Sequence, residues 1–157
     1  MKILIVYYSR GGNTERVAND IAARLGADIE KIIDKKSRNG LFGFIFGGRD
    51  AMRERETEIG NLIKNVADYD LVIFGTPIWA SNITPAIRTY INKVKNNLKN
   101  TAFFITSGNT DSATIVGKIE KLVGKKIRAH VGLNNRELKN KETYNKKITN
   151  FVEAIKI

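Results

Sequence analysis

Hydrophobic positions along the chain form two alternating kinds of segment. Short continuous apolar runs indicate strands that are buried in a sheet, whereas apolar residues spaced three and four apart indicate amphipathic helices. The expected strands cover residues 2–8, 28–33, 71–75, 101–106 and 126–133. The expected helices cover residues 13–25, 58–67, 83–98, 112–123 and 140–155. Strands and helices therefore alternate along the whole chain.

This alternation predicts a parallel sheet with helices on both faces. Residues 2–8, 71–75 and 101–106 are almost continuously apolar and are expected at its centre. Residues 28–33 and 126–133 include polar positions and suit the edges. With strands numbered in chain order, 2-1-3-4-5 satisfies both requirements. We therefore expect one doubly wound five-stranded α/β domain, residues 1–157, with a ligand site between the first and third strands, where the topology reverses.

Composition narrows the classes of function. The formal net charge is +11, but the basic residues are spread along the chain, so we expect a generally basic surface and acidic partners rather than nucleic acid. The chain has no cysteine, which excludes disulfides, thiol catalysis and cysteine-bound metals. No apolar run has the length of a signal peptide or a membrane span, so a cytoplasmic protein without stable membrane association is expected.

Polar loops follow each of the three expected central strands. Because the carboxyl ends of parallel strands meet at one edge of a sheet, we expect these loops to form the ligand site together. The first loop comprises Ser9, Arg10, Gly11, Gly12, Asn13 and Thr14. The second comprises Thr76, Pro77, Ile78, Trp79, Ala80, Ser81 and Asn82, and the third Ser107, Gly108 and Asn109.

The first loop leads into a helix, whose amino terminus favours an anion. Its sequence matches neither the nucleoside-triphosphate loop nor the dinucleotide fingerprint, so a single phosphate monoester is the better candidate. Alternatively, Asn13 or Thr14 merely caps the helix and the glycines form a turn. Arg10 either pairs with the phosphate or points to solvent, and we favour solvent.

The second loop holds the single tryptophan of the chain, Trp79. Its position after a strand end would suit an aromatic platform for a flat ligand. The alternative is that the ring folds back onto the core. Pro77 stiffens this loop and keeps Thr76 extended.

The three loops together resemble those of the flavodoxin family. Residues 9–14 are similar to its phosphate loop, Ser/Thr-x-Thr-Gly-x-Thr, residues 76–79 to its Thr-Pro-Ile-Tyr/Trp loop, and Ser107-Gly108 to its third loop. The resemblance implies an FMN cofactor whose phosphate is held by residues 9–14. Residues 76–82 would line the isoalloxazine, with Trp79 stacking on it or shielding it, and residues 107–109 would meet its pyrimidine side.

Two residues depart from the family pattern. Gly11 stands where the family has threonine, so one side-chain donor is lost. Ala80 stands where flavodoxins have a glycine whose peptide can flip toward the flavin, so that flip costs more and one-electron chemistry is in doubt. In addition, typical flavodoxins are acidic, so this basic chain is expected to give FMN a less negative potential.

We find no catalytic triad, paired carboxylates or metal-ligand cluster, so we name no catalytic or metal-binding residue. The first hypothesis is an FMN-binding electron-transfer protein that serves redox partner proteins. The second is an FMN-dependent oxidoreductase that takes electrons from NAD(P)H to a quinone or similar acceptor. The third is a basic binding module without flavin.

Residues 39–55 have no single hydrophobic period. Phe42, Phe44 and Phe46 alternate as in a strand, whereas Leu41, Phe44, Ile45 and Met52 would share a helix face. We expect a loop packed over the sheet edge. The alternatives are a lid over the flavin, a homodimer contact, a hydrophobic docking surface or a transient membrane contact.

Overall fold

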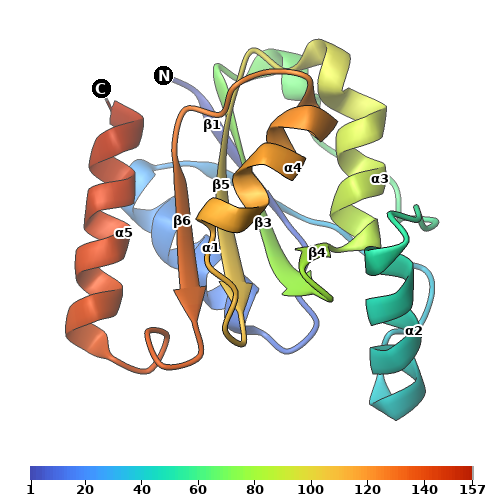
Figure 1. Cartoon of the computed structure of the whole chain (residues 1–157). Coiled ribbons are helices and arrows are strands. Elements are labelled where there is room, and N and C mark those ends of the chain that lie inside the picture. Colours follow the sequence, from blue (N-terminus) through green and yellow to red (C-terminus); the bar gives the residue numbers. More distant parts are fainter. Residues whose placement is uncertain (157) are drawn as a thin grey trace.

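The computed structural model describes residues 1–156 and has a central parallel sheet in the order β2-β1-β3-β5-β6 (Figure 1). This is the expected order, because the extra short strand β4 pairs only with β3. The strands are β1 Ile3–Tyr7, β2 Asp28–Lys31, β3 Leu71–Trp79, β4 Asn82–Ile83, β5 Asn100–Ser107 and β6 His130–Asn134. The helices are α1 Asn13–Leu25, α2 Gly40–Met52, α3 Pro85–Val94, α4 Ala113–Val123 and α5 Lys141–Lys156, with 3-10 turns at Val66–Asp68 and Lys95–Asn97.

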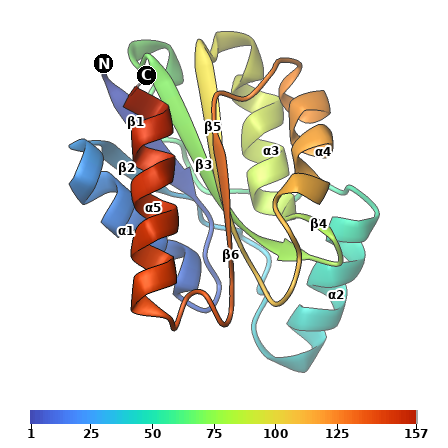
Figure 2. The same ribbon diagram turned by 60° about the vertical axis from the view of Figure 1, so that its left-hand side comes forward.

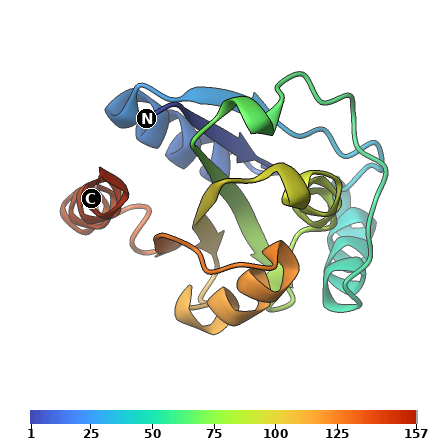
Figure 3. The same cartoon turned by 90° about the horizontal axis from the view of Figure 1, so that it is seen from above.

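Alternate residues of the sheet face two separate cores. Leu4 and Val6 of β1 belong to the core that contains α3 and α4, whereas Ile3, Ile5 and Tyr7 belong to the core that contains α1 and α5. Figures 2 and 3 show these two helix pairs on opposite faces of the sheet, with α2 beside α3. The expected doubly wound arrangement is therefore confirmed.

The second polar loop is not a loop as predicted. Strand β3 continues through Pro77 to Trp79, and a two-residue turn returns the chain into β4. The turn residues Ala80 and Ser81 have φ values of 46° and 57°, the left-handed conformation of a tight hairpin turn. Neither residue is a glycine, so this turn is strained.

The predicted helix at residues 58–67 is wrong. The Lys35 amide donates to the Glu58 carbonyl, and the Gly60 amide donates to the Ile33 carbonyl, at 2.9 Å and 2.8 Å. Asp34 and Ile59 form an isolated antiparallel bridge. These backbone groups therefore pair with the segment after β2, and only the short turn at Val66–Asp68 is helical.

The loop predicted for residues 39–55 is also wrong, because most of this segment forms α2. The helix turns Gly43, Gly47 and Ala51 inward. A Cβ atom on Gly47 would lie 2.9 Å from Cζ3 of Trp79, so the backbone of α2 packs directly on that ring. Glycines lower intrinsic helix propensity, and here this close packing offsets the loss.

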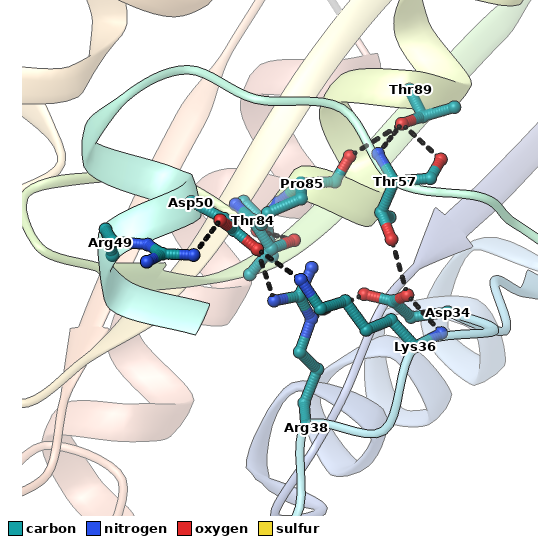
Figure 4. Close-up of polar contacts among 10 residues, drawn as sticks. Asp34, Lys36, Arg38, Arg49, Asp50, Thr57, Thr84, Pro85 and Thr89 are labelled. Atoms are coloured by element: carbon teal, nitrogen blue, oxygen red, sulfur yellow. Dashed lines mark hydrogen bonds and ion pairs between the residues drawn. The ribbon is translucent and has the colours of Figure 1, made fainter. Parts of the chain in front are cut away.

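A buried ion-pair cluster fastens α2 to the segment after β2 (Figure 4). The Arg38 guanidinium donates to Asp50 of α2 at 2.7 Å and to Asp34 at 3.0 Å. Asp34 also accepts from the Thr57 hydroxyl at 2.8 Å. Lys36 adds a second cation 3.2 Å from Asp50. The cluster therefore joins α2 to the chain on both sides of it.

Replacing Asp50 tests this anchor. Asp50→Asn leaves the buried Arg38 charge with one carboxylate fewer and should lower the free energy of unfolding by about 3–5 kcal/mol. Burial alone raises the pKa of Asp50, but hydrogen bonds from Arg38 and Lys36 outweigh it and hold the pKa below its ordinary value. The stabilisation is therefore present above the unfolded-state pKa of about 3.9 and is lost as pH falls through the lower folded-state value.

Urea unfolding of the unmodified protein and of Asp50→Asn, at pH 7 and at stepwise lower pH, measures the difference in their free energies of unfolding. Exposed Glu58, which pairs with Lys35, provides the matched control, because Glu58→Gln removes one carboxylate from a surface pair. Equal losses in the two variants at pH 7 would contradict the anchoring role of Asp50.

The hairpin turn generates a second prediction. Ser81→Gly should raise the free energy of unfolding by about 0.5–1 kcal/mol, because the relief of left-handed strain exceeds the greater entropy of an unfolded glycine. Ala23→Gly, at an exposed position in α1, should instead destabilise by about 1 kcal/mol. Thermal unfolding measures both, and a lower melting temperature for Ser81→Gly would show that the turn is not strained.

Candidate functional site

A cavity of about 300 Å³ opens at the carboxyl ends of β1, β3 and β5. It is the place where the three loops were expected to meet. Residues of all three loops line it: Ser9, Arg10, Gly11, Asn13 and Thr14; Pro77, Ile78 and Trp79; and Ser107 and Gly108. Phe44, Thr106 and Asn135 complete the lining.

The first loop forms an uncapped helix start. Gly12 is the N-cap of α1, with φ of 91°, and no side chain of the described residues caps the helix. The predicted alternative of a cap by Asn13 or Thr14 is therefore wrong, and the first-turn amides are left for another acceptor. The Gly12 amide donates to Ser9 Oγ at 3.1 Å, which leaves the Ser9 hydroxyl hydrogen able to donate.

Two side chains in the first turn of α1 already have hydrogen-bond partners. The buried Thr14 hydroxyl pairs with that of Thr106 at 2.8 Å, which ties the first loop to β5. Glu15, in the first turn of α1, accepts from the Tyr7 hydroxyl at 2.8 Å and from Lys31 at 3.0 Å. These two hydrogen bonds lower the pKa of Glu15. The pKa of Tyr7 is raised, mainly by burial of its hydroxyl and secondly by the hydrogen bond to the negatively charged Glu15. Glu15 is not among the cavity-lining residues, and Lys31 compensates its charge.

Arg10 does not simply point to solvent, as was favoured. Its guanidinium carbon lies 5.2 Å from the centre of the Trp79 ring and 5.3 Å from that of Phe44. Such contacts are cation–π interactions. Arg10 is the one charged residue among the described lining residues, and none of them is a carboxylate. The cavity is therefore electropositive.

Trp79 belongs both to the core and to the cavity wall. Its side chain is buried and meets Tyr8 edge to face, with 5.6 Å between ring centres. It also packs under Gly47 of α2. The two interpretations of this residue are thus compatible, because the core fixes the orientation of an aromatic wall.

The remaining predicted site residues do not line this cavity. Thr76 donates its hydroxyl to the Pro77 carbonyl at 2.8 Å, and Asn82 Oδ1 accepts from the Ile83 amide at 2.9 Å. Thr76 Oγ1 also accepts from the Thr84 amide at 3.3 Å, so this side chain links the two sides of the hairpin. Asn82 Oδ1 also accepts from Arg88 at 3.1 Å, so it joins the hairpin to α3. Gly12, Ala80, Ser81 and Asn109 are also outside the lining.

Sequence reasoning missed three lining residues. Thr106 ends the third apolar run, and Asn135 directly follows β6, so the shared sheet edge was a usable signal for both. Phe44 comes from α2, and its position depends on the packing of that helix. No sequence pattern indicated which of the phenylalanines of residues 39–55 would reach the site.

A second, mostly apolar cavity of about 430 Å³ adjoins the first. The two share Phe44, Ile78 and Trp79 as walls. Ile45, Gly48, Arg49, Met52 and Ala80 line the rest of it. An apolar molecule in this cavity would therefore lie directly beside the first site.

Residues 1–156 offer neither a membrane-spanning helix nor a cluster of metal ligands. No helix in that range is long and apolar enough to span a bilayer. No three acidic or histidine side chains in it cluster closely enough to hold a metal ion.

The fold and the loop-lined cavity at the switch point define a doubly wound ligand-binding protein. Residues 2–155 match the flavodoxin family model. The chain therefore belongs to the flavodoxin family.

Solved structures share this fold. A flavoprotein in complex with FMN from Lactobacillus acidophilus NCFM is 21% identical, with a TM-score of 0.74 over 88% of this chain and 96% of that one. A protein from Bacteroides eggerthii DSM 20697 is 23% identical, with a TM-score of 0.77 over 99% and 98%. Oxidised flavodoxin 1 from Bacillus cereus is 20% identical, with a TM-score of 0.55 over 99% and 98%.

The two loop glycines should respond differently to alanine. Gly12→Ala should lower the free energy of unfolding by about 1–2 kcal/mol, because Gly12 adopts a left-handed conformation. Gly11→Ala should leave it within about 0.5 kcal/mol, since a Cβ atom there meets nothing within 4 Å and the backbone is not left-handed. Chemical denaturation of the two variants tests this, and equal effects would refute the asymmetry.

Proposed function

We propose that the chain binds FMN in the loop-lined cavity and acts as an electron-transfer flavoprotein. One observation carries the proposal: an uncapped helix start, an arginine and an aromatic wall face the same cavity. The first two features suit a phosphate, and the third suits a flat ring system. The FMN complex described for the Lactobacillus acidophilus relative supports the same cofactor.

Each part of the cavity has a distinct role in this proposal. Ser9, Asn13 and the first amides of α1 would donate hydrogen bonds to the phosphate. Ile78, Trp79 and Phe44 would exclude water from the ring, and the Ser107–Gly108 backbone would meet its polar edge. FMN would supply the electron chemistry, so the protein would only need to bind and tune it.

A carrier is favoured over an enzyme because no histidine or carboxylate is among the described lining residues. Such a site offers no side chain for general acid–base catalysis near neutral pH.

An FMN-dependent NAD(P)H:quinone-type oxidoreductase is a second candidate. The adjoining apolar cavity favours it, because a quinone-like acceptor there would lie directly beside the first site, next to the shared walls Phe44, Ile78 and Trp79.

Arg10 provides the most direct test of FMN binding. Titration of FMN into the protein should give saturable binding, measured by a change in flavin fluorescence. Arg10→Gln should weaken it about tenfold, because it removes the positive charge of the cavity lining. Lys146→Gln, at an exposed position of α5, removes the same charge elsewhere and should leave FMN binding unchanged. Failure of the unmodified protein to bind FMN would reject both flavin functions.

Redox titration of the FMN-loaded proteins separates the remaining alternatives. The potential should be more negative in Arg10→Gln than in the unmodified protein, because a nearby cation favours the reduced, more negative flavin. Resolved one-electron steps would favour the carrier. Steady NAD(P)H oxidation in the presence of a quinone would favour the oxidoreductase.

A further inference from the structure

A second polar cavity lies between α3 and α4, which pack side by side (Figure 1). It has a volume of about 300 Å³ and shares no lining residue with the proposed FMN site. Its lining consists of Glu54, Arg88, Lys95, Lys118, Lys121 and Leu122. Four bases and one acid therefore face this space, which we call the basic cleft.

Arg88 is buried in the basic cleft, and its one ion pair is with an exposed carboxylate. Its side chain is only 9% exposed. One guanidinium nitrogen donates to the neutral Asn82 Oδ1 at 3.1 Å, and Nε has no hydrogen-bond partner among residues 1–156. The carboxylate of Glu54 is 3.8 Å away, but that side chain is 59% exposed. Solvent therefore screens the single ion pair of Arg88.

The buried Arg38 shows how the fold compensates such a charge elsewhere. It pairs with two buried carboxylates, Asp34 and Asp50, at 3.0 Å and 2.7 Å. Burial lowers the pKa of both arginines, but in Arg38 the two carboxylates outweigh it and the pKa is raised. The pKa of Arg88 stays below its ordinary value, despite Glu54 and Glu56. The surroundings of Arg88 are therefore short of negative charge.

The lysines of the basic cleft add further positive charge to it. The hydrogen bonds described for two of them are to neutral oxygens. Lys118 donates to the Ser81 carbonyl at 3.0 Å, and Lys95 donates to Asn92 Oδ1 at 3.3 Å. Lys121 is exposed at the rim. Within the described chain, none of the three forms an ion pair with a carboxylate.

We propose that the basic cleft binds a small molecule through its phosphate groups, with Arg88, Lys118 and Lys121 as the main donors. A diphosphate matches the observations, because its several oxygens can accept from all three side chains at once. Its negative charge also offsets the three positive charges that Glu54 leaves uncompensated. A concave cavity of this size favours a small anion over the extended contact that nucleic acid requires.

Inorganic pyrophosphate is the probe for this site, followed by NMR on the ¹⁵N-labelled full chain saturated with FMN. Pyrophosphate should give saturable shifts of the Arg88 Nε–H signal and of the Lys118 and Lys121 amides. The amides of residues 11–14 report the other cavity separately. Even if FMN fails to bind, the two sites therefore remain distinguishable.

Exposed lysines allow a test that does not threaten the fold. Lys118→Ala combined with Lys121→Ala should weaken pyrophosphate binding about tenfold or more. The matched control removes the same charge with Lys139→Ala and Lys146→Ala, two exposed positions outside the cleft, and should bind as the unmodified protein does. Glu54→Gln should strengthen binding severalfold, because it removes the carboxylate that competes for Arg88.

The outcomes separate the proposal from its rivals. Titration with ADP shows whether a nucleoside adds contacts: tighter binding than pyrophosphate indicates a nucleotide, and equal binding indicates the diphosphate alone. Absence of saturable shifts at Arg88 would overturn the proposal. So would equal weakening by the control pair, or binding of a single-stranded oligonucleotide in place of pyrophosphate.

Discussion

The parallel pairing of β1 with β3 is the constraint on which the rest of the structure depends. It sets Tyr7 beside Gly75, and the Tyr8 amide extends the pairing by donating to the Gly75 carbonyl at 3.1 Å. Strand β1 ends at this level, whereas β3 continues beside β5 to Pro77 and ends at Trp79. One continues into α1 on one face, and the other continues through the hairpin to α3 on the opposite face. A cavity forms where the two connections separate.

The aromatic side of that cavity depends on an unusual helix. Most helices of this kind bury large side chains, whereas α2 buries glycines and lets its backbone approach Trp79. The ion pairs of Arg38 with Asp34 and Asp50 hold it in place, and its phenylalanines consequently lie outward or over the site. The contact of Arg10 with Phe44 therefore depends on ion pairs that lie outside the first loop.

Three arginines show how surroundings decide what the same guanidinium does. Arg38 is buried between carboxylates and holds two segments together. Arg10 is exposed, lies over aromatic rings and gives the proposed FMN site its charge. Arg88 is buried with a neutral amide as its close partner, and its charge is left for an anion from outside. The difference lies in which acceptors the fold brings within reach.

The sequence by itself determined the order of the strands, the two helical layers and the edge at which the polar loops meet. Those features follow from local periodicity and from the geometry of parallel sheets. Only the tertiary structure decided that residues 40–52 form a helix, that residues 58–67 do not, and that Trp79 ends a strand. These outcomes depend on contacts between distant segments, such as Gly47 with Trp79 and Gly60 with Ile33. Hydrophobic pattern alone does not encode them, because close backbone packing places glycines inside and phenylalanines outside.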